Sequence, residues 1–226
     1  MSTTRREFVE RMAAGAALVG GIPLTARMEK VASVAAPPVK DEWDLSWAKQ
    51  VTAAKNKAVF DSPEIESGLG MMRAGIWKAQ VNEVQGVPLS KVAAVTVLRH
   101  EGIVLAMQQS FWDKYGVGPM KKATGLDGKP TNTNPVLVSP ADGGLPPVLA
   151  NARLEKFIKG GGIALGCNLA FELDIVPIVM EHDKLGHDEA RKLGLTMLVP
   201  GVILQPSGVF AVVHAQEAGA QYVGLS

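Results

Sequence analysis

The chain has 226 residues, and its 23 lysine and arginine residues nearly balance 22 aspartate and glutamate residues, so the formal net charge is +1. A surface that binds nucleic acid or anionic lipid needs clustered positive charge, and this balance argues against both kinds of partner. Cys167 is the single cysteine, which excludes an intrachain disulfide. A domain of this size still buries roughly 70% of its unfolded surface without such crosslinks.

The beginning of the chain, MSTTRREFVERMAAGAALVGGIPLTA, places an arginine pair before an apolar run rich in glycine and alanine. This order is typical of a twin-arginine export signal. We expect residues 1–36 to be that signal, with cleavage near Ala35 or Ala36, and the protein to work in the periplasm. The run is shorter than the roughly 20 residues that cross a bilayer, so we expect no stable membrane span unless the leader is retained. A disordered basic tail or a lone surface helix is the alternative.

Residues 37–56 combine proline, charge and two tryptophans, and we expect a linker that lies across the domain, outside its core. Trp43 and Trp47 lie four residues apart, so a short helical turn would press both side chains onto the domain. The rest of the chain, residues 57–226, is expected to form one α/β domain.

Strand and helix patterns alternate along this domain. Short apolar, β-branched runs predict strands at 57–62, 91–100, 163–167, 201–206 and 220–225. Amphipathic or glycine-terminated stretches predict helices at 68–86, 102–116, 148–162, 168–198 and 207–219. The alternation predicts a parallel five-stranded sheet with helices on both faces.

Three segments of this pattern carry special features. Residues 117–147 are rich in glycine, proline, asparagine and lysine, match no packed element, and are expected to form a long functional or mobile loop. The helical stretch after residue 168 is expected to be interrupted at Pro177 and Gly186. The last helix has Ser207 at its N-cap and Gly219 as its stop.

The position of the lone thiol follows from this order of elements. Ligands and chemistry gather at the carboxyl ends of the strands in an open parallel sheet. Cys167 ends the strand IALGC, where the next helix begins near Asn168, and a helix amino terminus favours the thiolate. His100 and Glu101 follow the strand VAAVTVL, and Ser207 follows GVILQ, so these side chains would approach Cys167 if the strands are neighbours.

Each of these residues also has a plainer interpretation. Cysteine is among the most often buried residues and frequently packs as a small apolar side chain. A histidine at the end of a strand is often a simple surface or hydrogen-bonded residue. We therefore keep a packing role for Cys167 and a surface role for His100 as alternatives.

Three stretches, VAAVTVLRHEGIVLAMQQSFWDKYGVG, GGGIALGCNLAFELD and GVFAVVHAQEAGAQYVGL, resemble the DsrE/DsrF-like family of sulfur-relay proteins, in its exported branch with twin-arginine signals. The resemblance covers about residues 57–226, and its most specific feature is the short strand that runs into the GCN turn. It implies a five-stranded parallel sheet with flavodoxin-like layering, a homo-oligomer, and in several branches a cysteine that carries sulfane sulfur as a persulfide. Cys167 matches that cysteine by its place at the end of the strand, whereas the long segment 117–147 departs from the family pattern.

The resemblance and the residues together suggest an exported sulfurtransferase-type relay that needs no cofactor. The Cys167 thiolate would take sulfur from a donor and pass it to a thiol or sulfur-carrier protein partner. His100 would orient or stabilise the sulfur, the amides of Asn168 and Leu169 would stabilise negative charge, and Glu101 and Ser207 would complete the substrate site. The alternatives are a non-catalytic binding or assembly subunit, and a small-ligand protein that closes the long loop.

Other motifs fail on order or spacing. The glycines of KGGGIALG end a helix and precede a strand, which is the reverse of a dinucleotide-binding loop. TGLDGKPT is too short between its glycines for a phosphate loop. His182 and His187 are five residues apart, which places them on different sides of a helix, so we expect no metal site.

Overall fold

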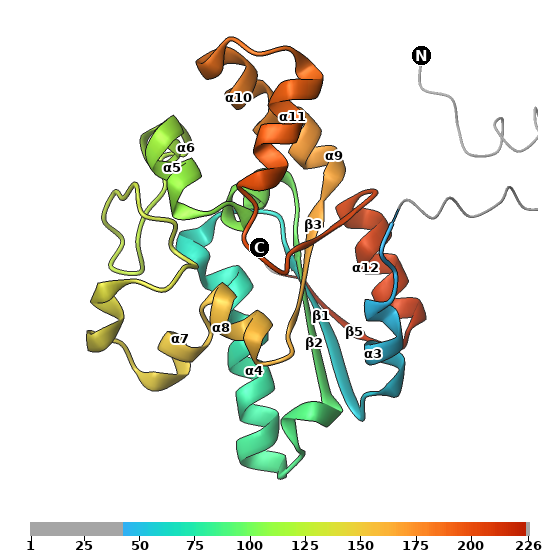
Figure 1. Cartoon of the computed structure of the whole chain (residues 1–226). Coiled ribbons are helices and arrows are strands. Elements are labelled where there is room, and N and C mark those ends of the chain that lie inside the picture. The colour runs from blue at the N-terminus through green and yellow to red at the C-terminus, as the bar shows by residue number, and fades with distance from the viewer. Residues whose placement is uncertain (1–42, 225–226) are drawn as a thin grey trace, which may run out of the picture. The chain divides into compact units, whose positions relative to one another are not determined.

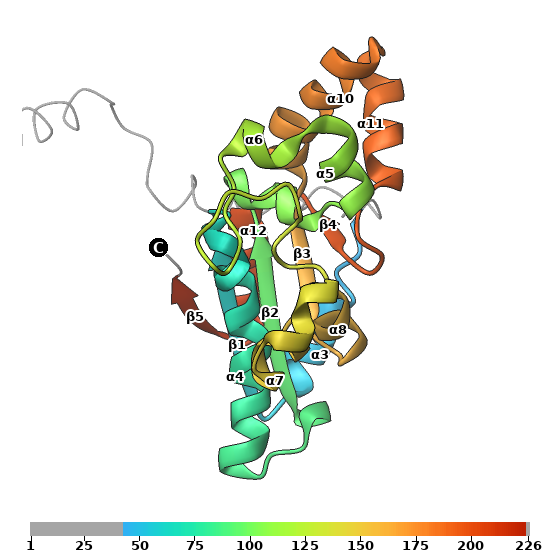
Figure 2. The ribbon, with the colours of Figure 1, turned by 90° about the vertical axis from the view of Figure 1, so that its left-hand side faces the viewer.

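The computed structural model describes residues 43–224, apart from the side chain of residue 141 (Figures 1 and 2). The expected export signal, residues 1–36, and the first part of the expected linker lie outside the described residues. Between residues 43 and 224, no helix is both long enough and apolar enough to span a membrane.

Five strands form one sheet in the order β4-β3-β2-β1-β5, and every pair of neighbours is parallel. The strands are β1 Asn56–Ser62, β2 Val92–Leu98, β3 Ile163–Cys167, β4 Ile203–Gln205 and β5 Gln221–Gly224. All seven residues of the central strand β2 are buried, as a parallel strand covered on both faces requires. The predicted parallel five-stranded sheet is therefore confirmed.

Helices flank both faces of the sheet (Figure 1). The α-helices are α3 Trp47–Ala53, α4 Leu69–Gln85, α5 Gln109–Tyr115, α6 Val117–Lys121, α7 Pro147–Asn151, α8 Leu154–Lys159, α9 Asn168–Ala170, α10 Val176–Asp183, α11 His187–Thr196 and α12 Gly208–Glu217. Short 3₁₀ segments lie at Glu66–Gly68, Leu89–Lys91, His100–Ala106 and Pro140–Gly144, and a π-helical turn at Phe171–Ile175.

The strand order decides which helices share a face. From β1 to β4, each new strand is added beside the preceding one in the same direction across the sheet. After β4 the chain crosses back over the sheet, and β5 is added beside β1 at the opposite edge. The returning helix α12 therefore covers the opposite face from α4, and α3 packs beside it. Alternate residues of β2 follow this division, because Ala93, Val95 and Val97 pack with α12, while Ala94 and Leu98 pack in the other core layer.

The expected helix 102–116 is wrong. Its first part is a 3₁₀ segment, His100–Ala106, and the α-helix begins only at Gln109. Residues 102–106 are all buried, so this part has no polar face. Gly102 permits the tight path, since a Cβ there would lie 2.4 Å from the Ser62 carbonyl oxygen.

The segment 117–147 is also more ordered than expected. It begins with α6, and Asn134 is fully buried. The Asn134 side-chain nitrogen donates to the carbonyl oxygens of Leu105, at 3.1 Å, and Met107, at 2.7 Å. Val136, two residues further on, is buried in the same core. The segment is therefore anchored to the domain at its middle.

Three further boundaries differ from the sequence expectation. The described end of the expected linker forms α3, and its Trp47 and Val51 are buried in the core beneath α12, while Trp43 is only half-buried. The expected helix 148–162 is two helices, α7 and α8. Pro177 lies in the first turn of α10 and does not interrupt it, because a missing N–H is harmless there.

Candidate functional site

A cavity of about 420 Å³ opens at the carboxyl edge of the sheet. Cys167 lines it from the end of β3, and His100 and Glu101 line it from the segment that follows β2. Ser207 lines it where β4 leads into α12, and Leu169 lines it from the helix after Cys167. Five of the six residues expected at the site thus share one cavity, because their strands are neighbours in the sheet.

Asn168 is the sixth residue, and it does not line the cavity. Its side-chain oxygen accepts a hydrogen bond from Arg191 Nη2 at 3.1 Å. Arg191 Nη1 lies 2.7 Å from a carboxylate oxygen of Glu172, whose other oxygen is 3.0 Å from His187 Nε2. The Asn168 side chain therefore belongs to a polar network that ties α11 to the helical stretch after Cys167.

The Cys167 sulfur caps the helical stretch that starts with α9. The residue is only 5% exposed, and its Sγ accepts a hydrogen bond from the Ala170 amide at 3.3 Å. Helical backbone continues through the π-helical turn and α10 to Asp183. The amide that reaches the sulfur belongs to Ala170, whereas the sequence predicted the amides of Asn168 and Leu169.

His100 lies at the rim of the cavity and not against the sulfur. Its backbone adopts a left-handed conformation with φ of +50°, and 67% of its side chain is exposed. Its Nδ1 lies 4.0 Å from a carboxylate oxygen of Glu64, and among the described residues it makes no hydrogen bond to Cys167. The expected role of His100 in orienting the sulfur therefore has no contact to support it.

Arg99 is the important lining residue that the sequence reasoning missed. Its Nε donates to Asp61 Oδ1 at 2.7 Å, and its Nη2 donates to Asp61 Oδ2 at 2.8 Å. The Tyr222 hydroxyl donates to Asp61 Oδ2 at 3.1 Å. The hydrogen bonds to Asp61 raise the pKa of the Arg99 guanidinium against the opposing effect of burial, and the nearby charges of Asp61, Tyr222 and Cys167 raise it further. Its place directly before His100 was the signal that could have revealed it.

The mouth of the cavity combines an ion pair with exposed apolar side chains. Lys121 Nζ lies 2.8 and 2.9 Å from the two carboxylate oxygens of Asp174, which joins α6 to the π-helical turn. Leu169, Leu173 and Val209 line the cavity and are 54%, 71% and 66% exposed; we name these three residues the apolar rim. Large exposed apolar residues gathered at one opening are typical of a surface that contacts another molecule.

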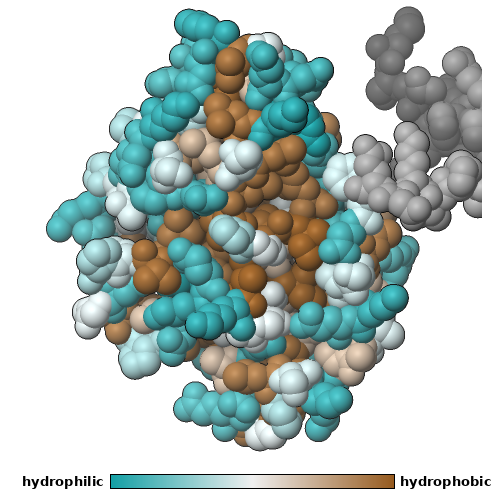
Figure 3. All heavy atoms as spheres, in the orientation of Figure 1, coloured by the Kyte–Doolittle hydropathy of each residue, from teal (hydrophilic) through white to brown (hydrophobic). Residues whose placement is uncertain are grey.

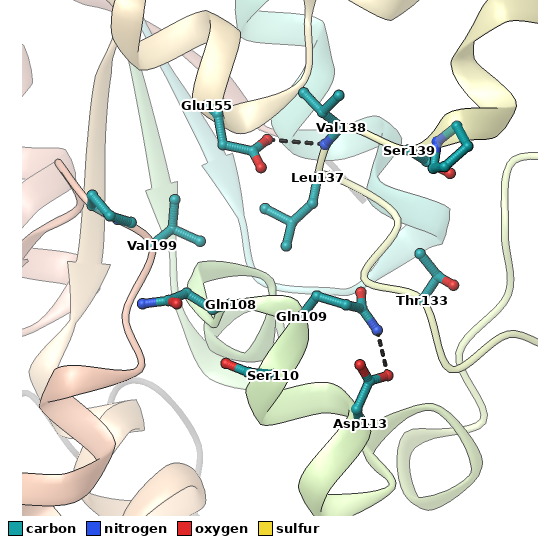
Figure 4. Close-up of a pocket in the computed structure, with 12 residues that line it drawn as sticks. Gln108, Gln109, Ser110, Asp113, Thr133, Leu137, Val138, Ser139, Glu155 and Val199 are labelled. Carbon is teal, nitrogen blue, oxygen red and sulfur yellow. Dashed lines mark hydrogen bonds between the residues drawn. The ribbon is translucent and has the colours of Figure 1, made fainter.

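A second and larger cavity, of about 630 Å³, lies between α5 and the segment before α7 (Figure 4). Glu155 accepts a hydrogen bond from the Val138 amide at 3.0 Å, and Gln109 donates to Asp113 at 2.8 Å. Among the residues that the structure describes, no cysteine, histidine, lysine or arginine lines this cavity. It therefore offers no nucleophilic thiol and no cationic side chain, and the Cys167 cavity is the better candidate for chemistry.

Residues 43–224 bring no three histidine, cysteine or acidic side chains together in a way that would hold a metal ion. No family model matches the chain, and no curated protein matches it. The site combines a capped thiol, a guanidinium clamped by Asp61 and the apolar rim around one cavity. The site thus places a thiol and a guanidinium around the same cavity.

Proposed function

We propose that this chain is an exported sulfur-relay protein of the DsrE/DsrF-like kind, in which Cys167 carries sulfane sulfur as a persulfide. The observation that carries the proposal is the shared cavity at the carboxyl edge of a parallel sheet, which both the capped Cys167 and Arg99 line. The resemblance of the sequence to that family supports the same chemistry. The periplasm as its location and a homo-oligomer as its working form are parts of this proposal.

The transfer needs no external oxidant. The Cys167 thiolate attacks the outer sulfur of a donor such as thiosulfate, a bond forms between the two sulfurs, and the donor's own S–S bond breaks. Sulfite leaves with the electron pair of that bond, and Cys167 retains a persulfide anion. A thiolate on the acceptor then attacks the outer sulfur of the persulfide, so the acceptor becomes the persulfide and Cys167 returns as a thiolate.

Each feature of the cavity has a part in these steps. The Ala170 amide donates a hydrogen bond to the Cys167 sulfur and holds it in place before attack and after release. Burial shields the persulfide from unselective reaction, because Cys167 is only 5% exposed. The apolar rim offers a contact surface for the partner that delivers or accepts sulfur.

The proposal is tested by weighing the intact full-length chain after treatment with thiosulfate or inorganic polysulfide. We expect a gain of one sulfur atom that a thiol reductant removes and that Cys167→Ser abolishes. Cys167 is the single cysteine, so no other thiol competes. A chain that gains no sulfur from either donor would count against the carrier function.

The low exposure of Cys167 favours a second candidate, a binding or assembly subunit in which the thiol only packs. Thiol titration separates the two functions. A carrier reacts with a small alkylating reagent in the native state, whereas a packed cysteine reacts only after unfolding.

A further inference from the structure

We propose that Arg99 is the anion-binding residue of the Cys167 cavity, and that the cavity therefore takes sulfur donors that carry negative charge at or beside the transferred sulfur. This inference rests on the proposed function and adds the class of donor to it. Thiosulfate and the persulfide anion of an organic thiol share this chemistry.

The guanidinium is held in one orientation by groups behind it. Asp61 accepts two hydrogen bonds from Arg99 and a third from Tyr222, and only 6% of the Asp61 side chain is exposed. Arg99 itself is 31% exposed and lines the cavity. Among the described residues, its Nη1 has no hydrogen-bond acceptor, so this nitrogen remains available to an anion.

The start of α12 holds the arginine in place from the other side. A Cβ on Gly208 would lie 2.5 Å from Arg99 Cβ and 2.6 Å from its Cδ, so the arginine side chain lies directly on the glycine backbone. Ser207 Oγ accepts the Phe210 amide at 3.1 Å. The amides of Gly208 and Val209 belong to the first turn, where no helical acceptor exists, and both residues line the cavity.

The other charged residues around the cavity are paired or lie at its rim. Arg99 is therefore the residue that determines whether the cavity prefers anionic or neutral molecules. Lys121 is paired with Asp174, which also lines the cavity, and both oxygens of that carboxylate are within 2.9 Å of the lysine. His100 lies 4.0 Å from Glu64 at the rim, and Glu101 is exposed. An anion beside Cys167 therefore meets the Arg99 guanidinium and the first amides of α12, with the Asp61 carboxylate on the far side of the guanidinium.

The preference of the cavity for anions is measured by alkylating native Cys167 with two reagents of similar size, the anion iodoacetate and the neutral iodoacetamide. The quantity of interest is the ratio of their rates, because changes in thiol nucleophilicity affect both reagents and cancel in the ratio. In Arg99→Gln we expect this ratio to fall about fivefold, the scale of one unit charge acting across a partly solvated cavity. Salt at about 0.5 M should lower the ratio in the wild type and leave it unchanged in the variant.

Two further variants protect the test against misfolding. Gly208→Ala keeps every charge but places a methyl group 2.5 Å from Arg99 Cβ, so the start of α12 and Arg99 must move apart and the ratio should fall without loss of a cation. Arg99→Lys keeps the charge without the two-pronged contact to Asp61 and should give an intermediate ratio. Arg73→Gln is the matched control, because Arg73 lies in α4, pairs with Glu66 at 3.8 Å and does not line the cavity.

The outcomes separate this inference from the carrier function. An unchanged ratio in Arg99→Gln, with sulfur loading of Cys167 intact, overturns the role of Arg99 alone. A lower ratio without any sulfur loading supports the anion site and removes the carrier function. A thiol that resists both reagents in the native chain overturns both, because the cavity would then give no access to it.

Sulfur loading from two donors identifies the source of the anion. If Arg99→Gln slows loading from thiosulfate and from glutathione persulfide alike, the site recognises the anionic sulfur that they share. Slower loading from thiosulfate alone assigns the inorganic donor, and slower loading from the persulfide alone assigns the organic one. No slowing with either donor contradicts the proposed donor class.

Discussion

The Asp61 carboxylate binds two neighbours at the carboxyl edge of the sheet. Arg99 bonds to both of its oxygens, and Tyr222 donates to one of them. The side chains come from β1, the end of β2 and β5, which are adjacent strands. Removing a buried charge that accepts several hydrogen bonds is costly, because the donor groups around it lose their acceptor and the opposite charge loses its partner.

Asp61→Asn should therefore lower the free energy of unfolding by about 1–3 kcal/mol in urea titrations. It should also lower the pKa of Tyr222, which burial and the bond to Asp61 hold above its ordinary value. The chain has two tyrosines, so the measurement is made by ultraviolet absorbance in a Tyr115→Phe background. An unchanged Tyr222 titration would show that the bond to Asp61 is absent in solution.

Lys78 is a second residue whose burial has a measurable consequence. Its Nζ donates to the carbonyl oxygens of Val92 at 2.6 Å, Leu89 at 3.0 Å and Gly161 at 3.4 Å, which joins α4 to the approaches of β2 and β3. Burial lowers the pKa of Lys78. The unfolded chain then binds more protons between the lowered value and the ordinary one, so the free energy of unfolding rises with pH across that range.

Lys78→Met should destabilise the protein by about 1–3 kcal/mol at neutral pH, because three carbonyl groups lose their donor. The variant also lacks the stabilisation that the wild type gains as the pH rises toward the ordinary lysine pKa. Urea titrations of both proteins from neutral pH upward should therefore show that the difference in the free energy of unfolding between wild type and variant increases with pH. A difference that stays constant would mean that Lys78 titrates normally in the folded state.

At the scale of elements, the segment 117–147 is an anchored part of the fold. Asn134 connects it to the 3₁₀ segment through Leu105 and Met107. Asn134→Ala should lower the free energy of unfolding by about 1–3 kcal/mol and speed proteolytic cleavage after residue 134. Limited proteolysis checks this, with Thr133→Ala as the control, because Thr133 directly precedes Asn134, is exposed, and its side chain has no hydrogen bond among the described residues. Equal cleavage of wild type and Asn134→Ala would contradict the anchoring.

Elements with a single strong physical cause were predictable from the sequence. The five strands were found because continuous apolar runs are required where a parallel strand is covered on both faces. Ser207 was found as an N-cap because its side-chain oxygen satisfies a free amide, and it accepts the Phe210 amide as predicted. The 3₁₀ segment His100–Ala106 was missed because its buried apolar residues resemble a helix locally, while tertiary packing decides its path.

The candidate site was predictable in its position and less so in its contacts. The rule for carboxyl ends of parallel strands brought Cys167, Glu101 and Ser207 to one cavity. The clamp on Arg99 depends on Asp61 and Tyr222, which are far away in sequence, so local patterns could not reveal it. The position of the His100 side chain depends on a left-handed backbone that no sequence signal announced.

At the scale of the whole domain, β4 forms one edge of the sheet. This edge lies on the side of the domain that faces the viewer in Figure 1, and the turned view in Figure 2 shows that position. That face carries a broad apolar area at its centre (Figure 3). Val202, Ile203 and Leu204 at this edge are only half-buried. An open apolar sheet edge favours contact with another chain, which agrees with the proposed homo-oligomer.

Sedimentation of the full-length chain should therefore show an oligomer, and Ile203→Lys should shift the population toward the monomer. A lysine at this half-buried edge position would be buried without a partner in an interface between two chains, whereas in the monomer its charge can reach water. The substitution should therefore destabilise the oligomer more than the folded domain. Exposed Val84→Lys in α4 is the control and should leave the oligomer unchanged. A wild-type chain that sediments as a monomer at all concentrations would contradict this part of the proposal.

The central claim is that Cys167 takes up sulfur and releases it to a thiol. The most direct measurement isolates the full-length chain after donor treatment, weighs it, adds an acceptor thiol and weighs it again. We expect one added sulfur atom on Cys167 that then appears on the acceptor. An unmodified Cys167 after donor treatment, or a sulfur atom that no acceptor thiol removes, would contradict the account.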